Sequence, residues 1–475
     1  MAGSGGADAD VTRLLAAAVV AAVMVFASTG CRRPQHDGCA DCNVVLISID
    51  TLRADHVGAY GYALPTTPRF DALAAKGVLF ENAIAQSSWT RPAHMSIFTG
   101  LHPHEHGFVS LGDTRRLEDS IPTLATVLKD KGYQTAAFVG GVNLSASFGF
   151  NRGFDTYRSN GKYFRDNLED IRYWLDHRPP GRFFLFLQGY DPHTPYLSDP
   201  VDRQVFGLPA APPQASHGAT CRSEGPVSRI DPYIKEYDAA THRGDRYVGK
   251  LVDELTARGL MQRTILVVLS DHGEEFLEHG RCFHLATLHR EVLHVPLLIV
   301  APGLVPRRVP GLVSASVTIA PTVMELLGGS IEPFPGPSLV EAAAGGPTPD
   351  DLIVSETERT EARRGDGHVR SLTTARDKLI HWTTQKRFAL YDVIKDPGET
   401  SALTAPDRQR ELAAELDKWT AAHPPRVESR RAQTSGTSQA SDEPDNPDYP
   451  DDPGGSDDED HQRRAEDLRS LGYAE

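Results

Sequence analysis

The chain has 475 residues, 40% of them hydrophobic, and a formal net charge of −15. This length and apolar content suffice for one large core and a smaller second one. Residues 441–460 carry ten Asp or Glu and no Lys or Arg, so the rest of the chain is only mildly acidic. The chain has no basic stripe, and its charge pattern indicates no nucleic-acid partner.

The first 31 residues have the pattern of an export signal. Arg13 precedes an uninterrupted apolar run over residues 14–27, and the small residues 28–30 lead to Cys31. The run is too short to span a bilayer comfortably, and its small-residue exit suits signal cleavage. A Cys after a Gly resembles the lipid-attachment site of bacterial lipoproteins. We therefore expect export to a bacterial periplasm or cell envelope with a lipid anchor at Cys31; a plain secretory signal and an uncleaved anchor are the alternatives.

Cys39 and Cys42 form a single C-x-x-C pair. An oxidising compartment permits these two residues to form a disulfide. A zinc site needs further ligands, and no second pair of this kind exists to supply them. We therefore expect a disulfide or free thiols here.

Strand and helix patterns alternate from residue 43 to about residue 330. Strands are predicted at 43–49, 135–139, 183–187, 264–270 and 295–300, and helices at 67–76, 92–100, 121–131, 233–258 and 318–327. Such a succession indicates a layered α/β/α sandwich with a mostly parallel central sheet. We assign residues 43–350 to this α/β domain, the larger part of the chain.

The alternation of strands and helices ends at a segment rich in Pro, Gly and Ala, and short strands follow it. Short strands are predicted at 351–355, 370–374, 378–382 and 389–391, with a helix at 408–419. These elements predict a C-terminal subdomain over residues 351–422, in which a small antiparallel sheet is covered by one helix. Residues 423–462 are too acidic and too polar to order themselves and are predicted to be a disordered tail. Residues 463–475 form a separate C-terminal segment.

Two of the predicted strands end on acidic side chains. Asp50 follows the first strand, and Asp271 and His272 follow the strand at 264–270. Long β-branched runs of this kind are typical of strands buried on both faces of a parallel sheet. Side chains just past such strands lie at the carboxyl edge of the sheet, where open α/β folds bind ligands. Carboxylate oxygens with one imidazole suit Ca²⁺, Mn²⁺ or Zn²⁺.

Thr90 lies at the start of a predicted short helix, which Pro92 and Gly100 bracket. Backbone N–H groups and the helix dipole favour a bound anion at that end. A hydroxyl placed there can attack a phosphoryl or sulfuryl centre. The alternative is that Thr90 is only an N-cap, and on local sequence alone that interpretation is favoured.

These residues belong to a series of motifs that resembles the sulfatase family, within the alkaline-phosphatase-like superfamily. The motifs that carry the resemblance are, in order, Ile47-Ser-Ile-Asp50-Thr-Leu-Arg-Ala-Asp55-His56, Thr90-x-Pro92-x-His94 with Thr99-Gly100, Tyr190-Asp191-Pro192-His193, Ser270-Asp271-His272-Gly273-Glu274, and Leu390-Tyr391-Asp392. The match extends over nearly all of residues 43–419. The resemblance implies an alkaline-phosphatase-like fold and a hydrolase of sulfuric or phosphoric esters, acting on a small-molecule or glycan substrate.

The resemblance also implies roles for individual residues. Asp50, Asp271 and His272 would hold one divalent metal ion, and the Thr90 oxygen would complete the ligand set. His193 would protonate the leaving group or bind an ester oxygen. His284 stands where the family often has Lys and would contact the substrate anion or the leaving group. The alternative for each histidine is an ordinary hydrogen-bonding role in a turn.

Several positions depart from the family pattern. Classical members convert a Cys or Ser into formylglycine, whereas Thr90 has no known route to that aldehyde. The usual Arg of the nucleophile motif is His94, a weaker and titratable partner for an anion. A second metal-binding acid is replaced by Thr51, which shifts the expected metal from Ca²⁺ toward Zn²⁺ or Mn²⁺. The family's Lys-x-His segment is also absent, and Asn143 is the candidate to replace its hydrogen-bond donors.

Three functions are compatible with this sequence. The first is a metal-dependent ester hydrolase with Thr90 as nucleophile, acting on phosphate or phosphonate esters in preference to sulfates. The second is a transferase of phosphoryl-linked head groups. Transferases of this kind usually have several membrane spans, and the sequence shows none, which argues against this function. The third is a catalytically inactive binding protein of the cell envelope.

Overall fold

The computed structural model describes residues 38–110, 115–159, 161–211, 231–359 and 367–426. The predicted export segment, residues 463–475 and all but the first few residues of the predicted tail lie outside these ranges. Among the described helices, none has the length and apolar character needed to cross a membrane.

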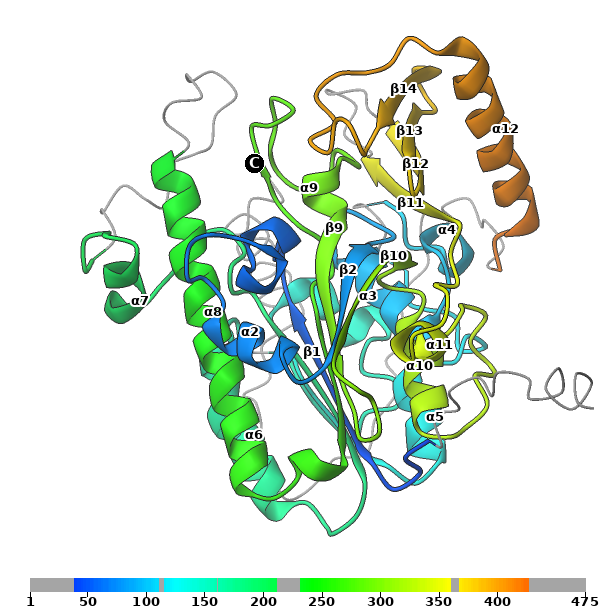
Figure 1. The fold of residues 1–475 in the computed structure, drawn as a ribbon. Coiled ribbons are helices and arrows are strands. Elements are labelled where there is room, and N and C mark those ends of the chain that lie inside the picture. The colour runs from blue at the N-terminus through cyan, green and yellow to red at the C-terminus, as the bar shows by residue number, and fades with distance from the viewer. Residues whose placement is uncertain (1–37, 111–114, 160, 212–230, 360–366, 427–475) are drawn as a thin grey trace, which may run out of the picture.

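An eight-stranded sheet forms the centre of the molecule, in the order β10-β2-β9-β6-β1-β5-β3-β4 (Figure 1). Its strands are β1 (Asn43–Ile49), β2 (Val78–Ile84), β3 (Gln134–Phe138), β4 (Thr156–Arg158), β5 (Phe183–Gly189), β6 (Thr264–Leu269), β9 (His294–Val300) and β10 (Arg307–Ser314). Within this sheet β9 runs antiparallel to its neighbours β2 and β6, and the other pairs are parallel. The expected mostly parallel sheet is confirmed.

Helices cover both faces of this sheet because successive side chains of its strands point in opposite directions. On β1, Val45 and Ile47 face a core shared with α2, α6 and α8, whereas Val44 and Leu46 face a core shared with α3, α5 and α10. The longer helices are α2 (Pro68–Ala74), α3 (Thr90–Thr99), α5 (Leu124–Asp130), α6 (Phe164–His177), α8 (Asp231–Ala257) and α10 (Ile319–Leu326). Figure 1 shows α2, α6 and α8 on one side of the sheet and α3, α5 and α10 on the other.

Short elements connect the larger ones. They are the α-helices α4 (Pro103–His106), α7 (Pro200–Val205), α9 (Arg290–Leu293) and α11 (Val340–Ala343), the 3₁₀ helices η1 (Ala54–His56), η2 (Gly58–Tyr60), η3 (Val142–Leu144), η4 (Ala146–Phe148) and η7 (Met261–Arg263), and the two-stranded hairpin β7 (Glu275–Phe276) and β8 (Cys282–Phe283).

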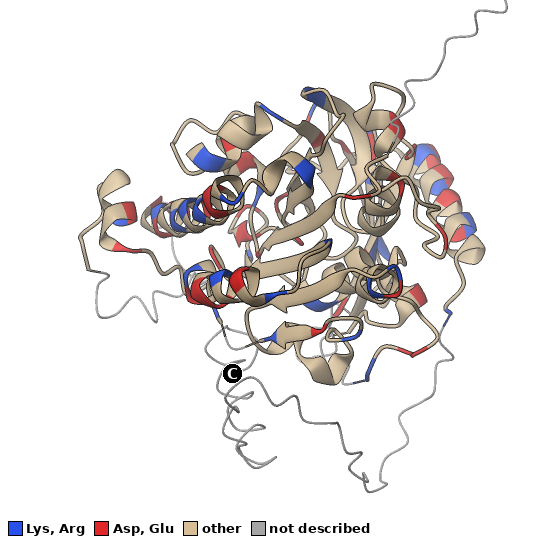
Figure 2. Cartoon of the chain, turned by 90° about the horizontal axis from the view of Figure 1, so that it is seen from below, with Lys and Arg blue, Asp and Glu red and all other residues tan. Residues whose placement is uncertain are grey.

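A second, antiparallel sheet follows near the C-terminal end of the described chain. Its strands are β11 (Leu352–Arg359), β12 (Gly367–Thr374), β13 (Asp377–Trp382) and β14 (Arg387–Asp392), and the helix beside them is α12 (Pro406–Ala422). Leu412 and Leu416 of α12 pack against Leu372 and Leu390 of the sheet. The expected small sheet with a covering helix is therefore confirmed. Figure 2 shows charged residues of both signs along α12 and the outer helices, while the central strands carry few.

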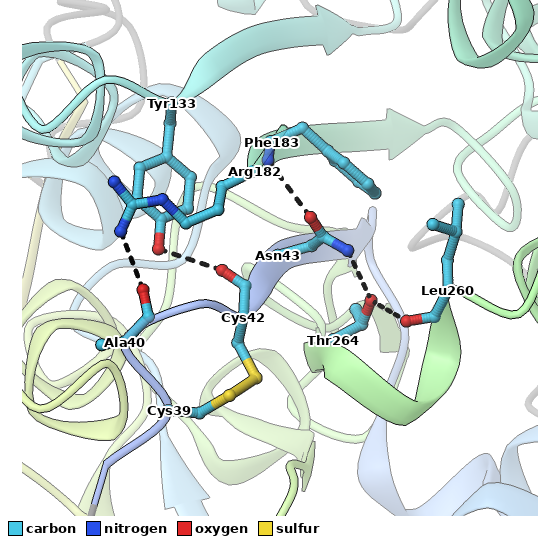
Figure 3. The surroundings of a disulfide bond; sticks show 9 residues. All are labelled: Cys39, Ala40, Cys42, Asn43, Tyr133, Arg182, Phe183, Leu260 and Thr264. Atoms are coloured by element: carbon cyan, nitrogen blue, oxygen red, sulfur yellow. Dashed lines mark hydrogen bonds between the residues drawn. A yellow bond between two sulfur atoms is a disulfide. The ribbon is translucent and has the colours of Figure 1, made fainter. Parts of the chain in front are cut away.

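The amino edge of the central sheet is held by a disulfide and a set of polar contacts (Figure 3). Cys39 and Cys42 are disulfide-bonded immediately before β1. Tyr133 donates a hydrogen bond to the carbonyl oxygen of Cys42. The side chain of Asn43 links β5 and β6, because it accepts from Phe183 N–H and donates to the Thr264 hydroxyl. One of the two expected states of the C-x-x-C pair, the disulfide, is present.

Candidate active site

The seven residues for which the sequence predicts a role in the site lie together at the carboxyl edge of the central sheet. They are Asp50, Thr90, His94, His193, Asp271, His272 and His284. Strands β5, β1 and β6 are adjacent and parallel, so their carboxyl ends meet at one edge. Asp50 follows β1, Asp271 and His272 follow β6, and His193 comes four residues after β5. The fold therefore brings together segments that lie more than 200 residues apart in the chain.

Asp50, Asp271 and His272 form a compact cluster whose potential ligand atoms all lie within 4.8 Å of one another. Nε2 of His272 lies 3.3 Å from Oδ2 of Asp271 and 3.6 Å from Oδ1 of Asp50. Nδ1 of His272 lies 3.0 Å from the carbonyl oxygen of Gly273. Because that carbonyl can only accept, Nδ1 carries the proton and Nε2 presents its lone pair to the cluster.

Thr90 is the first residue of α3 and points its hydroxyl at this cluster. Its Oγ1 lies 3.4 Å from Oδ2 of Asp50 and 3.2 Å from Nε2 of His272. The preceding residue, Trp89, has extended backbone angles and makes no side-chain cap. The side chain of Thr90 thus faces the cluster while its backbone begins a ten-residue helix.

His94 lies one turn further along α3, beneath the cluster. Its Nδ1 is 2.8 Å from the carbonyl oxygen of Thr90 and 3.4 Å from Oδ2 of Asp271. Its Nε2 is 2.9 Å from the hydroxyl of Ser48 on β1. The ring is fully buried, and burial lowers its pKa. A neutral His94 that donates from Nδ1 and accepts from Ser48 therefore supports the Thr90 backbone.

His193 and His284 extend the cluster on its other side. The ring of His284 lies 4.5 Å from the ring of His272 and 5.1 Å from the ring of His193, measured between centroids. Nδ1 of His284 is 3.2 Å from Oε1 of Glu274, and Nδ1 of His193 donates to the carbonyl oxygen of Thr194 at 2.6 Å. Burial lowers the pKa of both His193 and His284 to about 3.

The cluster concentrates buried carboxyl groups. Burial, followed by the charges of Asp271 and Glu274, raises the pKa of Asp50 well above its usual range. Burial also raises the pKa of Asp271 to about 6 and that of Glu274 to about 7. Carboxylates buried this closely are costly unless a positive charge lies among them.

The donor set fits a divalent cation. Oδ1 of Asp50 is fully buried and accepts no hydrogen bond from any residue that the structure describes. Neither oxygen of Asp271 makes a well-formed hydrogen bond within the same ranges. Two carboxylates and an imidazole lone pair are the ligand types that Ca²⁺, Mn²⁺ and Zn²⁺ accept.

The structure also places polar residues whose contacts the sequence did not predict. Gln188 near the end of β5 donates to Oδ2 of Asp50 at 2.8 Å, and Ser48 contacts His94. A polar residue inside an otherwise apolar buried strand is the signal that could have indicated both. Asn143 is fully buried, and neither atom of its amide has a hydrogen-bond partner among the described residues.

The candidate residues are almost inaccessible in this conformation. Thr90, Asp50, Asp271 and His272 are 0% exposed and His284 is 4% exposed. Two surface cavities lie away from these residues: one of about 400 Å³ lies between the end of α3 and α12, and one of about 380 Å³ lies beside α2 and the start of β10.

Comparisons with known proteins agree with this arrangement. Residues 42–330 match the family described as Sulfatase. A Δ4,5-hexuronate-2-O-sulfatase of Bacteroides thetaiotaomicron is 24% identical over 421 residues, which cover 78% of this chain and 86% of that protein. An ulvan-active sulfatase of Formosa agariphila is 26% identical over 325 residues, which cover 60% of this chain and 62% of that protein.

Solved structures share the fold. A protein in complex with its substrate D-glucosamine-2-N,6-O-disulfate has a TM-score of 0.69 at 19% identity, covering 81% of this chain and 98% of that chain. The phosphonate monoester hydrolase of Agrobacterium radiobacter has a TM-score of 0.66 at 20% identity, covering 80% of this chain and 96% of that chain. With the family match over residues 42–330, these findings identify the chain as a member of the sulfatase family of ester hydrolases.

Proposed function

We propose that this chain is a metal-dependent hydrolase of phosphate, phosphonate or sulfate esters in which Thr90 is the nucleophile. The observation that carries the proposal is the position of the Thr90 hydroxyl, 3.2 Å from His272 and 3.4 Å from Asp50. A hydroxyl at a helix start is placed to attack an anionic ester.

The proposed reaction proceeds in two displacements. In the first, Oγ1 of Thr90 bonds to the phosphorus or sulfur atom, the bond to the leaving oxygen breaks, and the Thr90 proton passes to an acceptor such as Asp50 Oδ2. In the second, water attacks the same phosphorus or sulfur atom, the bond to Oγ1 breaks, Oγ1 recovers its proton from Asp50, and the proton of the water passes to the residue that protonated the leaving oxygen. Both steps follow the general logic of covalent catalysis, which divides one difficult displacement into two easier ones.

The other residues bind, orient and move protons. Asp50, Asp271 and His272 would hold a divalent cation, which when bound would lower the pKa of the Thr90 hydroxyl and neutralise charge on the transferred group. We assign proton transfer to the leaving oxygen, or a hydrogen bond to an ester oxygen, to the protonated forms of His193 and His284, which the negative charge of a bound substrate would favour over the neutral forms. His94 was predicted to contact the substrate anion; its contacts with Thr90 and Ser48 favour a positioning role.

The substrate class follows from the nucleophile and from the relatives. Several relatives act on sulfated glycans, and a glycan or small-molecule ester is therefore the proposed substrate. Because Thr90 lacks the route to formylglycine used by classical members, we expect phosphate or phosphonate esters to be turned over faster than sulfate esters. The metal is proposed to be Zn²⁺ or Mn²⁺ in preference to Ca²⁺.

The test is a metal-reconstituted assay with an aryl sulfate, a phosphomonoester, a phosphodiester and a phosphonate ester. The wild type is compared with Thr90→Ala. We expect wild-type turnover of at least one phosphorus ester and loss of that turnover in the variant. Turnover that survives in Thr90→Ala would remove Thr90 from the mechanism, and no turnover by the wild type would favour a binding protein.

Export is proposed separately, since the leader lies outside the described residues. The Cys39–Cys42 disulfide is the form expected of an oxidising compartment. Expression of the full chain with Cys31→Ala should move the protein from the detergent phase to the aqueous phase in detergent partitioning. Unchanged partitioning would contradict a lipid anchor at Cys31.

A further inference from the structure

Gln188 is a fully buried polar residue within the apolar run of β5. Gln188 pairs with Ser48 in the parallel register between β1 and β5. Ser48 lies two residues before Asp50 in the chain. A buried amide without partners is costly, so its hydrogen bonds decide whether the position is tolerated.

Both ends of the Gln188 amide are engaged. Oε1 accepts from the backbone N–H of Gly140 at 2.8 Å, and Nε2 donates to Oδ2 of Asp50 at 2.8 Å. A backbone N–H can only donate, so the oxygen of the amide must face Gly140 and the NH₂ group must face Asp50. The side chain therefore joins the ends of β3, β5 and β1 in one fixed orientation.

The backbone at Gly140 cannot easily move away from this contact. A Cβ added at this position would lie 2.8 Å from the carbonyl oxygen of Lys162 and 2.9 Å from the ring of Tyr190. The absence of a side chain at Gly140 thus lets Lys162 and Tyr190 pack closely against its backbone, and this packing holds the Gly140 N–H beside Gln188.

This amide divides the two oxygens of Asp50 between two tasks. Oδ2 is occupied by Gln188 at 2.8 Å and by the Thr90 hydroxyl at the longer distance of 3.4 Å. Oδ1 accepts no hydrogen bond from the described residues and lies 3.6 Å from Nε2 of His272. The carboxylate is held by one oxygen while the other faces Asp271 and His272.

We infer that Gln188 is a positioning residue of the proposed metal site: its amide fixes the carboxylate of Asp50 so that Oδ1 is aimed at the cation. The inference rests on the proposed function, since it assigns the partner of a ligand in that site. Gln188 is not proposed as a metal ligand itself, because its amide donates to Asp50, which is one of the proposed ligands. Partners of this kind typically change metal affinity about 10- to 100-fold when they are replaced.

The test measures metal binding directly. Metal-free wild type and Gln188→Met are titrated with MnCl₂, and separately with CaCl₂ and ZnCl₂, by isothermal calorimetry. Methionine keeps the length of the side chain and removes both hydrogen-bonding groups, so affinity should fall about 10- to 100-fold. Gln188→Asn, which keeps an amide but withdraws it by one methylene, serves as the second variant and should also lose affinity.

Gln86 offers a matched control. It is also fully buried, and its amide likewise bridges groups at a strand end, donating to the Ile84 carbonyl and accepting from Ser316 N–H. Gln86→Met should lower the unfolding temperature and leave metal affinity within about twofold of wild type, because no metal ligand depends on it.

The outcomes separate this inference from the proposed function. Wild-type affinity in a folded Gln188→Met or Gln188→Asn protein, or an equal loss in Gln86→Met, would overturn the positioning role and leave the metal site standing. A wild type that binds none of the three metals would overturn the site and this inference together. Circular dichroism of each metal-free variant establishes that the protein titrated is folded.

Discussion

The hydroxyl oxygen of Thr90 lies 3.2 Å from Nε2 of His272, although 182 residues separate them in the chain. The contact joins the first residue of α3 to the end of β6. Because Nδ1 of His272 is committed to the Gly273 carbonyl, its Nε2 can accept from the hydroxyl or bind a cation beside it. This pair therefore connects the proposed nucleophile with the proposed ligand set.

Conservative substitutions of Thr90 should distinguish the contribution of its hydroxyl group to activity from the contribution of its side-chain volume. Thr90→Val keeps the volume and removes the hydroxyl, and we expect kcat/KM to fall at least about 10³-fold because a nucleophile is lost. Thr90→Ser keeps the hydroxyl and should retain activity within about tenfold of wild type. Steady-state kinetics on the best ester of the panel measure both; a Thr90→Val protein that retains its activity would show that the hydroxyl is not the nucleophile.

Neutralising Asp271 should have opposite effects on the free and the metal-bound protein. Burial raises the pKa of Asp271 to about 6, so at pH 8 its charge opposes folding when no cation is present. In EDTA, Asp271→Asn is expected to be more stable than wild type by about 2 kcal/mol at pH 8. The rise in unfolding temperature that metal gives the wild type should be absent in this variant. The unfolding temperatures of both proteins are measured with and without metal. If metal raises the unfolding temperature of Asp271→Asn as much as that of wild type, the cation binds elsewhere.

The sequence was sufficient for the parts of the site that follow from strand patterns. Buried β-branched runs placed Asp50 and Asp271 at one edge, and Pro92 with Gly100 bracketed the helix that α3 forms. The sequence pattern predicts no strand at β2 or β10. β2 carries Glu81 and Asn82 in its centre, and β10 combines two Arg with Pro310 and Gly311. These side chains are tolerated because β10 lies at the sheet edge and Arg308 pairs with Glu81.

The contacts of Gln188 and His94 could not be predicted for a different reason. Each depends on a partner in a distant segment: Gly140 and Asp50 for the first, Ser48 for the second. Residue type indicates that such a side chain needs partners once it is buried, but not which partners the fold supplies. The element bounds differed by only a few residues, as for the helix predicted at 233–258, which the structure has at Asp231–Ala257.

A buried acid links the C-terminal sheet to the catalytic domain and should give stability an optimum in pH. Glu356 on β11 accepts from His104 of α4 and from His368 at 3.2 Å. Burial opposes its ionisation, but the hydrogen bonds of His104 and His368 outweigh burial and hold the pKa of Glu356 well below its usual range. Burial likewise opposes charge on His104, but its hydrogen bond to Glu356 raises the pKa of His104.

The signs of these two shifts define the pH window. The contribution of Glu356 is present above the ordinary glutamate pKa of about 4.3 and is lost as pH falls through the depressed value. The contribution of His104 is complete below about pH 6.5 and is lost as pH rises through the raised value. Urea midpoints measured from pH 3 to pH 9 should therefore peak between about pH 4.5 and 6.5. Glu356→Gln should flatten this profile, whereas Glu81→Gln, at the exposed pair with Arg308, should not.

Reduction of the Cys39–Cys42 disulfide should affect stability and spare catalysis. The bond lies at the amino edge of the sheet, whereas Asp50 and Asp271 lie at the carboxyl edge. Closing so short a loop contributes about 2 kcal/mol in the chain-entropy model. The double variant Cys39→Ser/Cys42→Ser is expected to lose stability of that order and to keep kcat/KM within about twofold, as urea unfolding and kinetics would show. A large loss of kcat/KM would contradict the separation of the two edges.

Asn143 offers a test of whether a buried amide is kept for the substrate. Its amide oxygen and nitrogen are buried without a partner among the described residues, an arrangement that costs about 1–3 kcal/mol for a group left unsatisfied. It lies in η3, which contacts α3, and the neighbouring Val142 packs against an apolar cluster that includes Trp89, the residue before Thr90. If the amide donates to the substrate anion, Asn143→Leu should raise the free energy of unfolding by about 1 kcal/mol and lower kcat/KM at least about tenfold.

The matched control for that change is Asn167, which is equally buried but donates to the Gly161 carbonyl at 3.2 Å. Asn167→Leu removes a hydrogen bond that the fold uses, so it should lower the free energy of unfolding by about 1 kcal/mol and leave KM unchanged. Opposite signs of the stability change in the two variants, together with a kinetic loss confined to Asn143→Leu, would assign the Asn143 amide to substrate binding. A destabilised Asn143→Leu with wild-type kcat/KM would instead mean that the amide serves the fold.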